Sequence, residues 1–222
     1  MYFLHIKDLF RRQELRRLVD IADRLNYISG RDDTNQDSPV KKNLQGDPAD
    51  PNTGEAATMV QKALLRNRMF LEYALPKKMT PPMIARYEPG MNYGEHTDAA
   101  VMPANRLTRA DISCTVFLSE KDSYEGGELR LRAGMEEITV KGELGSAVLY
   151  PTTPIHQVMP VTAGRRQVAV TFIQSQIGDH VKREILYELA CVLEEEGDRL
   201  SEDAHLRFTN AHTNLHRIWA EI

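Results

Sequence analysis

Several features that would point away from an ordinary globular protein are scarce in this chain. Two cysteines are too few for a disulfide framework, and we predict that Cys114, in a strand pattern, and Cys191, in a helical one, are buried thiols. No apolar run approaches the about twenty residues of a membrane span. The first residues lack the long apolar centre of a signal sequence, so we expect a cytoplasmic protein.

An excess of charge of one sign is also missing. The net charge is -4, from 28 Lys and Arg against 32 Asp and Glu, and the signs are interspersed along the chain. This gives no basic surface of the kind that nucleic-acid binding requires, so we expect neither nucleic acid nor a membrane as a partner. A length of 222 residues allows one substantial core and a small appendage.

Two helical patterns precede a region of strands. Apolar residues recur at helical spacing over 15–25, and again over about 55–74, where Pro76 stops the pattern. Between them, residues 26–52 are polar and rich in turn formers, with a short strand expected near 40–45. We expect both helices to pack on the outside of a sheet.

From residue 83 the pattern changes to short strands separated by turns. These strands are predicted at 83–87, 111–119, 128–131, 137–141, 146–150, 157–161 and 167–174. Such a series favours a sandwich or barrel, and a double-stranded β-helix, or jelly roll, fits it. The predicted fold class is α+β, with a jelly-roll core over about 80–177 and flanking N-terminal helices. One of the two alternating faces of 111–119 should line the cavity.

After Gly178 the chain becomes helical again. One apolar stripe runs over 181–192 and ends at Gly197, and a second runs over 208–222. We therefore divide the chain into a domain at 1–177 and a small C-terminal helical module at 178–222, docked against the barrel or a second subunit. Two apolar stripes that follow a barrel with its own core predict a homodimer.

A candidate metal site stands out within the strand region. His96 and Asp98 follow an extended segment, where residues two apart point to the same side, so both can hold one ion while Thr97 faces away. A third ligand is offered by His156, just after the turn-rich stretch 151–155. Two imidazoles and one carboxylate are the ligand set of non-haem Fe(II) oxygenases, which leaves positions open for a keto acid and O₂.

Arg166 decides between metal chemistries. It begins the alternating run 166–174, so it lies at the mouth of a strand. A planar guanidinium there suits bidentate pairing with a carboxylate, such as the distal one of 2-oxoglutarate. A His-x-Asp motif or an Arg at a strand start is weak evidence alone, whereas their conjunction in this order is much less common.

Three segments carry a resemblance to a known family. They are 86–102 (RYEPGMNYGEHTDAAVM), 124–129 (YEGGEL) and 171–175 (TFIQS). Together they resemble the bacterial PKHD-type hydroxylases, relatives of the prolyl 4-hydroxylase catalytic domain. Gly30-Arg31 and 40–45 (VKKNLQ) are similar to the family's N-terminal pattern, and the resemblance covers nearly the whole chain.

The resemblance implies the site and its chemistry. His96, Asp98 and His156 would bind Fe(2+), Arg166 would bind 2-oxoglutarate, and the Tyr87 hydroxyl would hydrogen-bond the keto acid, with no catalytic residue beyond the metal centre. The reaction would use O₂ to hydroxylate an unidentified substrate, releasing succinate and CO₂, with L-ascorbate as a candidate further cofactor. Residues 31–39 depart from the family pattern and are a candidate border of the substrate entrance.

Other interpretations remain open at this point. A cupin-like enzyme with a redox-inert metal would use Arg166 to clamp a substrate anion, and a non-catalytic sensor would bind 2-oxoglutarate or iron, although the intact ligand set argues against sensing. Residues 99–110 are either a lid or an inert loop. Phe172 and Gln174 are weaker site candidates. A second metal site at His205, His212 and His216 is disfavoured against solvated or partner-facing histidines, because no Glu or third carboxylate accompanies them.

Overall fold

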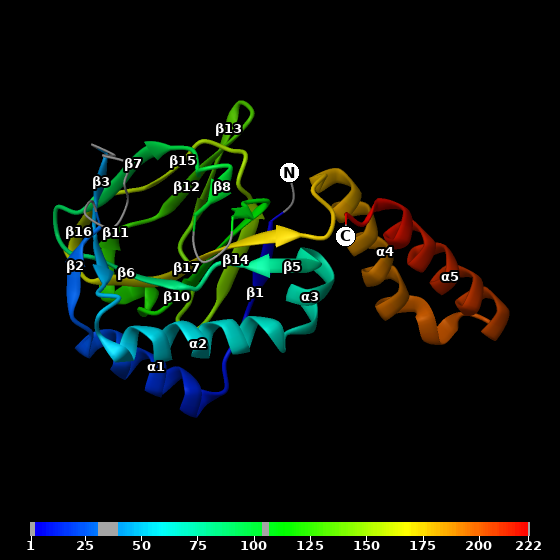
Figure 1. The fold of residues 1–222 in the computed structure, drawn as a ribbon, viewed down its shortest axis with the longest axis horizontal. Coiled ribbons are helices and arrows are strands. Elements are labelled where there is room, and N and C mark those ends of the chain that lie inside the picture. Colours follow the sequence, from blue (N-terminus) through cyan, green and yellow to red (C-terminus); the bar gives the residue numbers. More distant parts are fainter. Residues whose placement is uncertain (1–2, 31–39, 104–106, 222) are drawn as a thin grey trace.

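Two antiparallel sheets face each other at the centre of the computed structural model, which describes residues 3–30, 40–103 and 107–221 (Figure 1). Within these residues the larger sheet has the order β1-β14-β10-β17-β6-β4-β2, with β5 also paired to β17. Its strands are β1 (Leu4–Ile6), β2 (Tyr27–Ser29), β4 (Leu44–Gly46), β5 (Pro76–Met79), β6 (Met83–Tyr87), β10 (Ile112–Phe117), β14 (Ala147–Pro151) and β17 (Arg166–Ser175).

The smaller sheet has the order β13-β12-β15-β7-β3. Its strands are β3 (Lys41–Lys42), β7 (Asn92–His96), β12 (Leu129–Ala133), β13 (Glu136–Val140) and β15 (His156–Val158). Two strand pairs lie beside the sheets: β11 (Tyr124–Gly126) with β16 (Val161–Gly164), and β8 (Val101–Met102) with β9 (Thr108–Arg109). The architecture is the predicted jelly roll, and the fold class α+β is confirmed.

Side chains that alternate between the two faces of the larger sheet form two separate apolar cores. On β10, Cys114 and Val116 face a cluster shared with the N-terminal helices, whereas Phe117 faces a second cluster between the two sheets. On β17, Ala169 belongs to the first cluster and Val168 to the second. Successive side chains of a strand point to opposite faces, so every second residue along a strand faces the barrel interior.

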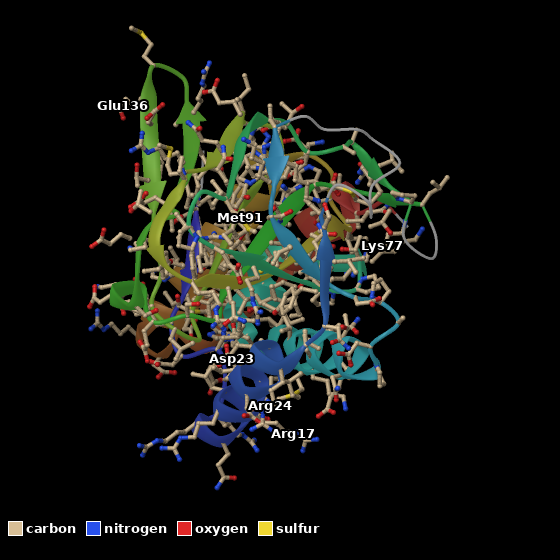
Figure 2. The ribbon with its side chains drawn as sticks, turned by 90° about the vertical axis from the view of Figure 1, so that its left-hand side faces the viewer. Arg17, Asp23, Arg24, Lys77, Met91 and Glu136 are labelled. Atoms are coloured by element: carbon tan, nitrogen blue, oxygen red, sulfur yellow. The ribbon has the colours of Figure 1, made fainter. Side chains whose placement is uncertain are left out.

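The helices α1 (Arg12–Arg24), α2 (Pro51–Leu65) and α3 (Arg68–Ala74) cover the outer face of the larger sheet (Figure 1). The β12–β13 hairpin, marked by Glu136, lies at the opposite end of the molecule from α1, which carries Arg17 and Arg24 (Figure 2). The predicted packing of both helical segments outside a sheet is confirmed.

Two boundaries were predicted wrongly. The helix expected at 55–74 is two helices, because the Asn67 side chain accepts a hydrogen bond from Phe70 N at 2.9 Å and starts α3. The strand expected at 157–161 is divided between β15 and β16, since Pro160, which lacks an N–H for strand pairing, lies between them.

The C-terminal helices α4 (His180–Glu196) and α5 (Glu202–Trp219) pack beside each other, joined by η2 (Gly197–Arg199) (Figure 1). Tyr187 of α4 meets Tyr73 of α3 edge to face, with ring centroids 5.5 Å apart. Arg183 donates to the carbonyl oxygens of Ile177 and Gly178, which ties α4 to the segment that connects it with β17. Among the described helices, none is long and apolar enough to cross a bilayer.

Candidate active site

Strand pairing brings two histidines together. β7 and β15 are neighbours in the smaller sheet, and their register places His96 directly opposite His156. The two imidazole centroids are 4.3 Å apart. Residues far apart in the sequence therefore form one cluster because the sheet topology makes their strands adjacent.

Asp98 completes the cluster from outside the strand. β7 ends at His96, and Asp98 lies two residues further on, in a segment without regular secondary structure. Its carboxylate still points at both rings, with Oδ1 3.9 Å from His96 Nε2 and Oδ2 3.6 Å from His156 Nε2. Thr97 faces away, as predicted, and is exposed.

These three side chains can hold a metal ion. Their candidate ligand atoms all lie within 4.8 Å of one another, and no other such group of three or more His, Cys, Asp or Glu residues occurs in the part of the chain that the structure describes. The side chains of His96, Asp98 and His156 are 12%, 9% and 4% exposed. A buried set of two imidazoles and one carboxylate matches the donor set of non-haem iron.

Backbone carbonyls fix the orientation of both rings. His96 Nδ1 lies 2.8 Å from Gly94 O, and His156 Nδ1 lies 3.0 Å from Pro154 O. A carbonyl can only accept, so each Nδ1 carries the proton and each Nε2 keeps its lone pair. This outer hydrogen bond is the usual way in which a protein orients a metal-binding histidine.

The electrostatics of the cluster favour a cation. Burial, helped by the neighbouring His156, lowers the pKa of His96 to about 4, so this ring is neutral at physiological pH. Burial also disfavours a charged His156, but the adjacent Asp98 carboxylate outweighs this effect and raises the pKa of His156. Asp98 Oδ2 is buried and has no hydrogen-bond partner among the described residues. The residues present fit a divalent metal ion, which would pair with this oxygen.

Two tyrosines pack against the histidines and were missed in the sequence. The Tyr93 ring stacks on His96 with centroids 3.5 Å apart and planes at 8°. Tyr150 meets His156 edge to face at 5.7 Å, and burial raises the pKa of its hydroxyl. In the sequence, Tyr93 was visible only as part of the segment 86–102, which contains His96 and Asp98. Tyr150 was visible only as the last residue of the predicted strand 146–150, six residues before His156.

Arg166 lies in the barrel interior. It is the first residue of β17, it is 1% exposed, and it stands opposite Tyr87 of β6, with its guanidinium carbon 5.0 Å from the centre of that ring. Its Nε and Nη1 atoms are buried without a hydrogen-bond partner among the described residues. A buried guanidinium with unpaired donors fits an anionic ligand, because burying such a charge unpaired is costly.

Its neighbours shape this arginine. Gly127 has a φ of +68°, and a Cβ added there would lie 2.9 Å from Arg166 Cδ, so a glycine lets the arginine stem pass. The Tyr124 hydroxyl accepts a hydrogen bond from Arg166. Tyr87 is buried, and that burial raises the pKa of its hydroxyl, which therefore keeps its proton at neutral pH. The Gly126-Gly127 pair was noted in the sequence only as part of a family segment.

The weaker candidates lie outside this cluster. Gln174 accepts a hydrogen bond from Arg109 N at 3.2 Å, and Phe172 is half-buried. Residues 99–110 include the β8–β9 pair that follows Asp98, while residues 104–106 lie outside the described residues, as does the candidate entrance segment 31–39.

Among the described residues, the C-terminal histidines do not gather with other candidate metal-binding side chains. His205 is exposed, but His212 Nε2 donates to Leu186 O at 3.2 Å and His216 Nε2 to Gln176 Oε1 at 3.2 Å. The latter two therefore contact their own chain while remaining partly exposed, because the α5 face that carries them packs against α4 and the segment before it.

Comparisons with known proteins agree with this geometry. Residues 82–174 match the pattern of the 2OG-Fe(II) oxygenase superfamily. A PKHD-type hydroxylase of Sphingopyxis alaskensis is 37% identical over 206 residues, covering 92% of this chain and 94% of that protein. Another, from Stenotrophomonas maltophilia, is 38% identical over 230 residues and covers 99% of both. The chain belongs to the PKHD-type hydroxylases.

As a PKHD-type hydroxylase, the protein is an Fe(II)- and 2-oxoglutarate-dependent dioxygenase. The matched span contains all five residues singled out in the sequence: Tyr87, His96, Asp98, His156 and Arg166. A solved prolyl-4-hydroxylase of Pseudomonas putida has the same fold, with a TM-score of 0.54, 18% identity, and coverage of 78% of this chain and 92% of the other. At that identity the likeness extends to the fold and not to the substrate.

Proposed function

We propose that this hydroxylase holds its iron through His96 Nε2, His156 Nε2 and the Asp98 carboxylate, and binds the distal carboxylate of 2-oxoglutarate through Arg166. The Tyr87 hydroxyl donates a hydrogen bond to the same keto acid. One observation supports this assignment above the others: a buried, partly unpaired carboxylate and a buried, partly unpaired guanidinium face the same barrel interior.

Fe(II), when bound together with 2-oxoglutarate and O₂, supplies the oxidising chemistry that hydroxylates a C–H bond and leaves succinate and CO₂. The chain's own residues bind and orient. Gly94 O and Pro154 O hold the two rings with their lone pairs facing inward. Arg166 and Tyr87 fix one end of the keto acid, and the rings of Tyr93 and Tyr150 keep water from the histidines.

Prolyl residues of a protein, a free amino acid, a peptide natural product and a siderophore-related molecule all fit a C–H hydroxylation. The family name does not select prolyl hydroxylation for this chain.

Succinate formation from 2-oxoglutarate tests the proposal. We expect it to require both Fe(II) and O₂, even without the substrate, at the slow rate of uncoupled turnover. His156→Ala and Arg166→Ala should abolish or strongly reduce it, while Arg165→Ala should not. A cupin-like enzyme or a sensor would form no succinate under any of these conditions, and that result would contradict the proposal.

The chain division and the oligomeric state are proposed from the C-terminal helices. We place the domain boundary at 177/178, just before α4 begins. Residues 1–177 then form the dioxygenase domain, with its jelly roll at about 80–177, and residues 178–222 form the helical module. We propose a homodimer formed through this module, because α4 and α5 expose large apolar side chains. They are Val181, Ile185, Val192, Leu206 and Ile218, between 43% and 73% exposed.

A cytoplasmic location is proposed because a reducing compartment keeps iron as Fe(II) and keeps the free thiols of Cys114 and Cys191 reduced. L-ascorbate is proposed as an accessory reductant that restores Fe(II) after uncoupled turnover. The mixed surface charge supports the proposal that neither nucleic acid nor a membrane is a partner.

A further inference from the structure

Three residues lie in a row across the larger sheet, at the end of the barrel that carries Arg166. Tyr87 of β6 stands opposite Arg166 of β17. On the other side of β6, Leu44, the first residue of β4, pairs with Arg86. Asn43 directly precedes β4, so one further step of the antiparallel register brings it opposite Tyr87. Asn43, Tyr87 and Arg166 therefore follow one another across the sheet.

Asn43 is a buried polar side chain in this row. It is 6% exposed, and its side chain makes a hydrogen bond to the Tyr87 hydroxyl. Its Oδ1 has no hydrogen-bond partner among the described residues, so the group that meets the hydroxyl is the amide nitrogen. An amide nitrogen can only donate, so the Tyr87 oxygen is the acceptor of this bond.

The direction of that bond matters for a ligand. A hydroxyl has one proton, and when its oxygen accepts from Asn43 that proton stays free to be donated elsewhere. The burial of Tyr87 raises its pKa, so the proton is present at neutral pH. A carboxylate accepts hydrogen bonds and cannot donate them, so it needs a neighbour whose proton is not already engaged.

We propose that Asn43 is a positioning residue of the 2-oxoglutarate site, whose amide N–H holds the Tyr87 hydroxyl so that its proton points to the bound keto acid. The inference rests on the proposed function, because it takes Tyr87 as a ligand of the keto acid. Asn43 acts through Tyr87, and its contribution exists only when the Tyr87 hydroxyl is present.

Gly30 leaves the room that Asn43 needs. Gly30 N donates to Asn43 O at 2.9 Å, which places the two residues opposite each other beyond the β2–β4 pairing. A Cβ added at Gly30 would lie 2.0 Å from Asn43 Oδ1 and 3.2 Å from Asn43 O. Any larger residue at position 30 must push the amide away from its place beside Tyr87.

A double-mutant cycle tests the inference. 2-Oxoglutarate is titrated calorimetrically, without O₂, into the Fe(II)-loaded full-length protein, with Asn43→Leu made both in the natural background and in Tyr87→Phe. Asn43→Leu should weaken 2-oxoglutarate binding about three- to tenfold in the natural background, the range of one neutral hydrogen bond. In Tyr87→Phe the same substitution should change binding less than about twofold.

Gly30→Ala is the second variant, in case Asn43→Leu does not fold. It leaves the Asn43 side chain intact but displaces it, so it should weaken 2-oxoglutarate binding in the natural background and not in Tyr87→Phe. Fe(II) affinity should be unchanged in both variants, since neither residue contacts a metal-binding side chain.

Two results would overturn the inference: equal weakening in both backgrounds, which would make Asn43 merely structural, or no weakening in the natural background. Arg166→Ala separates this failure from that of the proposed function. If Arg166→Ala weakens keto-acid binding and Asn43→Leu does not, only the inference about Asn43 fails. If neither Arg166→Ala nor Tyr87→Phe weakens it, the assignment of the site itself fails.

Discussion

Arg165 and Arg166 are neighbours in the chain whose side chains point to opposite faces of the larger sheet. Arg166 is buried between the two sheets, beside Tyr87. Arg165 lies on the surface, with Nη1 3.0 Å from Asp23 Oδ1 of α1 and a side chain that is 47% exposed. Two residues of the same charge, one position apart, thus have different environments and serve as matched test positions.

Arg166→Ala should weaken 2-oxoglutarate binding far more than iron binding, because the guanidinium lies beside Tyr87 and is not among the three proposed metal ligands. Charge-assisted hydrogen bonds contribute roughly 1.5 to 3 kcal/mol each, so losing a bidentate pair should raise the Kd about a hundredfold or more. Arg166→Lys keeps the charge but loses the planar pair of donors, so its Kd should lie between those of the natural protein and Arg166→Ala. Calorimetric titration with an inert keto-acid analogue on the metal-loaded protein measures both.

Arg165→Ala is the control for this experiment. It breaks only an exposed ion pair, so keto-acid binding should stay nearly unchanged. The assignment fails if Arg165→Ala is the variant that loses binding.

Gly127→Ala should disturb the 2-oxoglutarate site by displacing Arg166. Its Cβ would lie 2.9 Å from Arg166 Cδ and 3.0 Å from Val161 Cγ2, at a φ of +68°. We expect a loss of about 1 to 2 kcal/mol in the free energy of unfolding from the backbone conformation, together with weaker 2-oxoglutarate binding. Thermal unfolding and calorimetry measure the two effects.

Gly134→Ala separates strain from contact. Gly134 has almost the same φ, +69°, but a Cβ there would meet nothing within 4 Å. It should lose similar stability and keep normal keto-acid binding. Equal loss of binding in both variants would disprove a specific role for the space at Gly127.

The pair Glu14–Arg66 should make stability depend on pH. The hydrogen bond from Arg66 lowers the pKa of Glu14 from 4.5 to about 2. A depressed folded-state pKa stabilises the fold above the unfolded value of 4.5, and this contribution is lost as the pH falls toward 2. Because both side chains are about one third exposed, we expect roughly 0.5 to 1 kcal/mol.

Glu14→Gln should therefore lower the melting temperature at pH 7, and the difference from the natural protein should shrink as the pH falls below 4.5 and be nearly gone at about pH 2. Asp20→Asn, which breaks the more exposed pair with Arg24, should have little effect at either pH. A difference for Glu14→Gln that persists undiminished at pH 2 would contradict the argument.

If the protein is a homodimer, light scattering should give the natural protein the mass of two chains at every concentration tested. Ile185→Glu combined with Val192→Glu places two charges on the exposed apolar stripe of α4 and should give a monomer that still folds. Leu65→Glu, at an equally exposed apolar position on α2, should remain a dimer. A monomeric natural protein would refute the proposal.

Local patterns in the sequence predicted the parts of the fold that depend on neighbouring residues. The alternation over 167–174 correctly assigned the two faces of β17, and 83–87 matches β6. The division of α2 from α3 was missed, because the apolar spacing continues through the Asn67 cap and periodicity alone does not register it.

The sequence patterns did not predict which distant strands pair with each other. The residues of β7 and β15 indicated strands but not that the two strands would be neighbours, so the His96–His156 contact rested on residue chemistry and family resemblance. Asn43 went unnoticed for the same reason, since its value depends on the register that sets it opposite Tyr87. Tyr93 and Tyr150 likewise became visible only with the geometry of the rings.

The most direct test of the account is the visible charge-transfer band of a keto acid chelated to Fe(II), recorded after anaerobic addition of Fe(II) and 2-oxoglutarate to the full-length protein. The account predicts a weak band in the natural protein and in His205→Ala, an exposed histidine outside the site. His96→Ala, Asp98→Ala and His156→Ala should each abolish it. A band that persists unchanged in all three variants would contradict the central claim that these residues hold the iron.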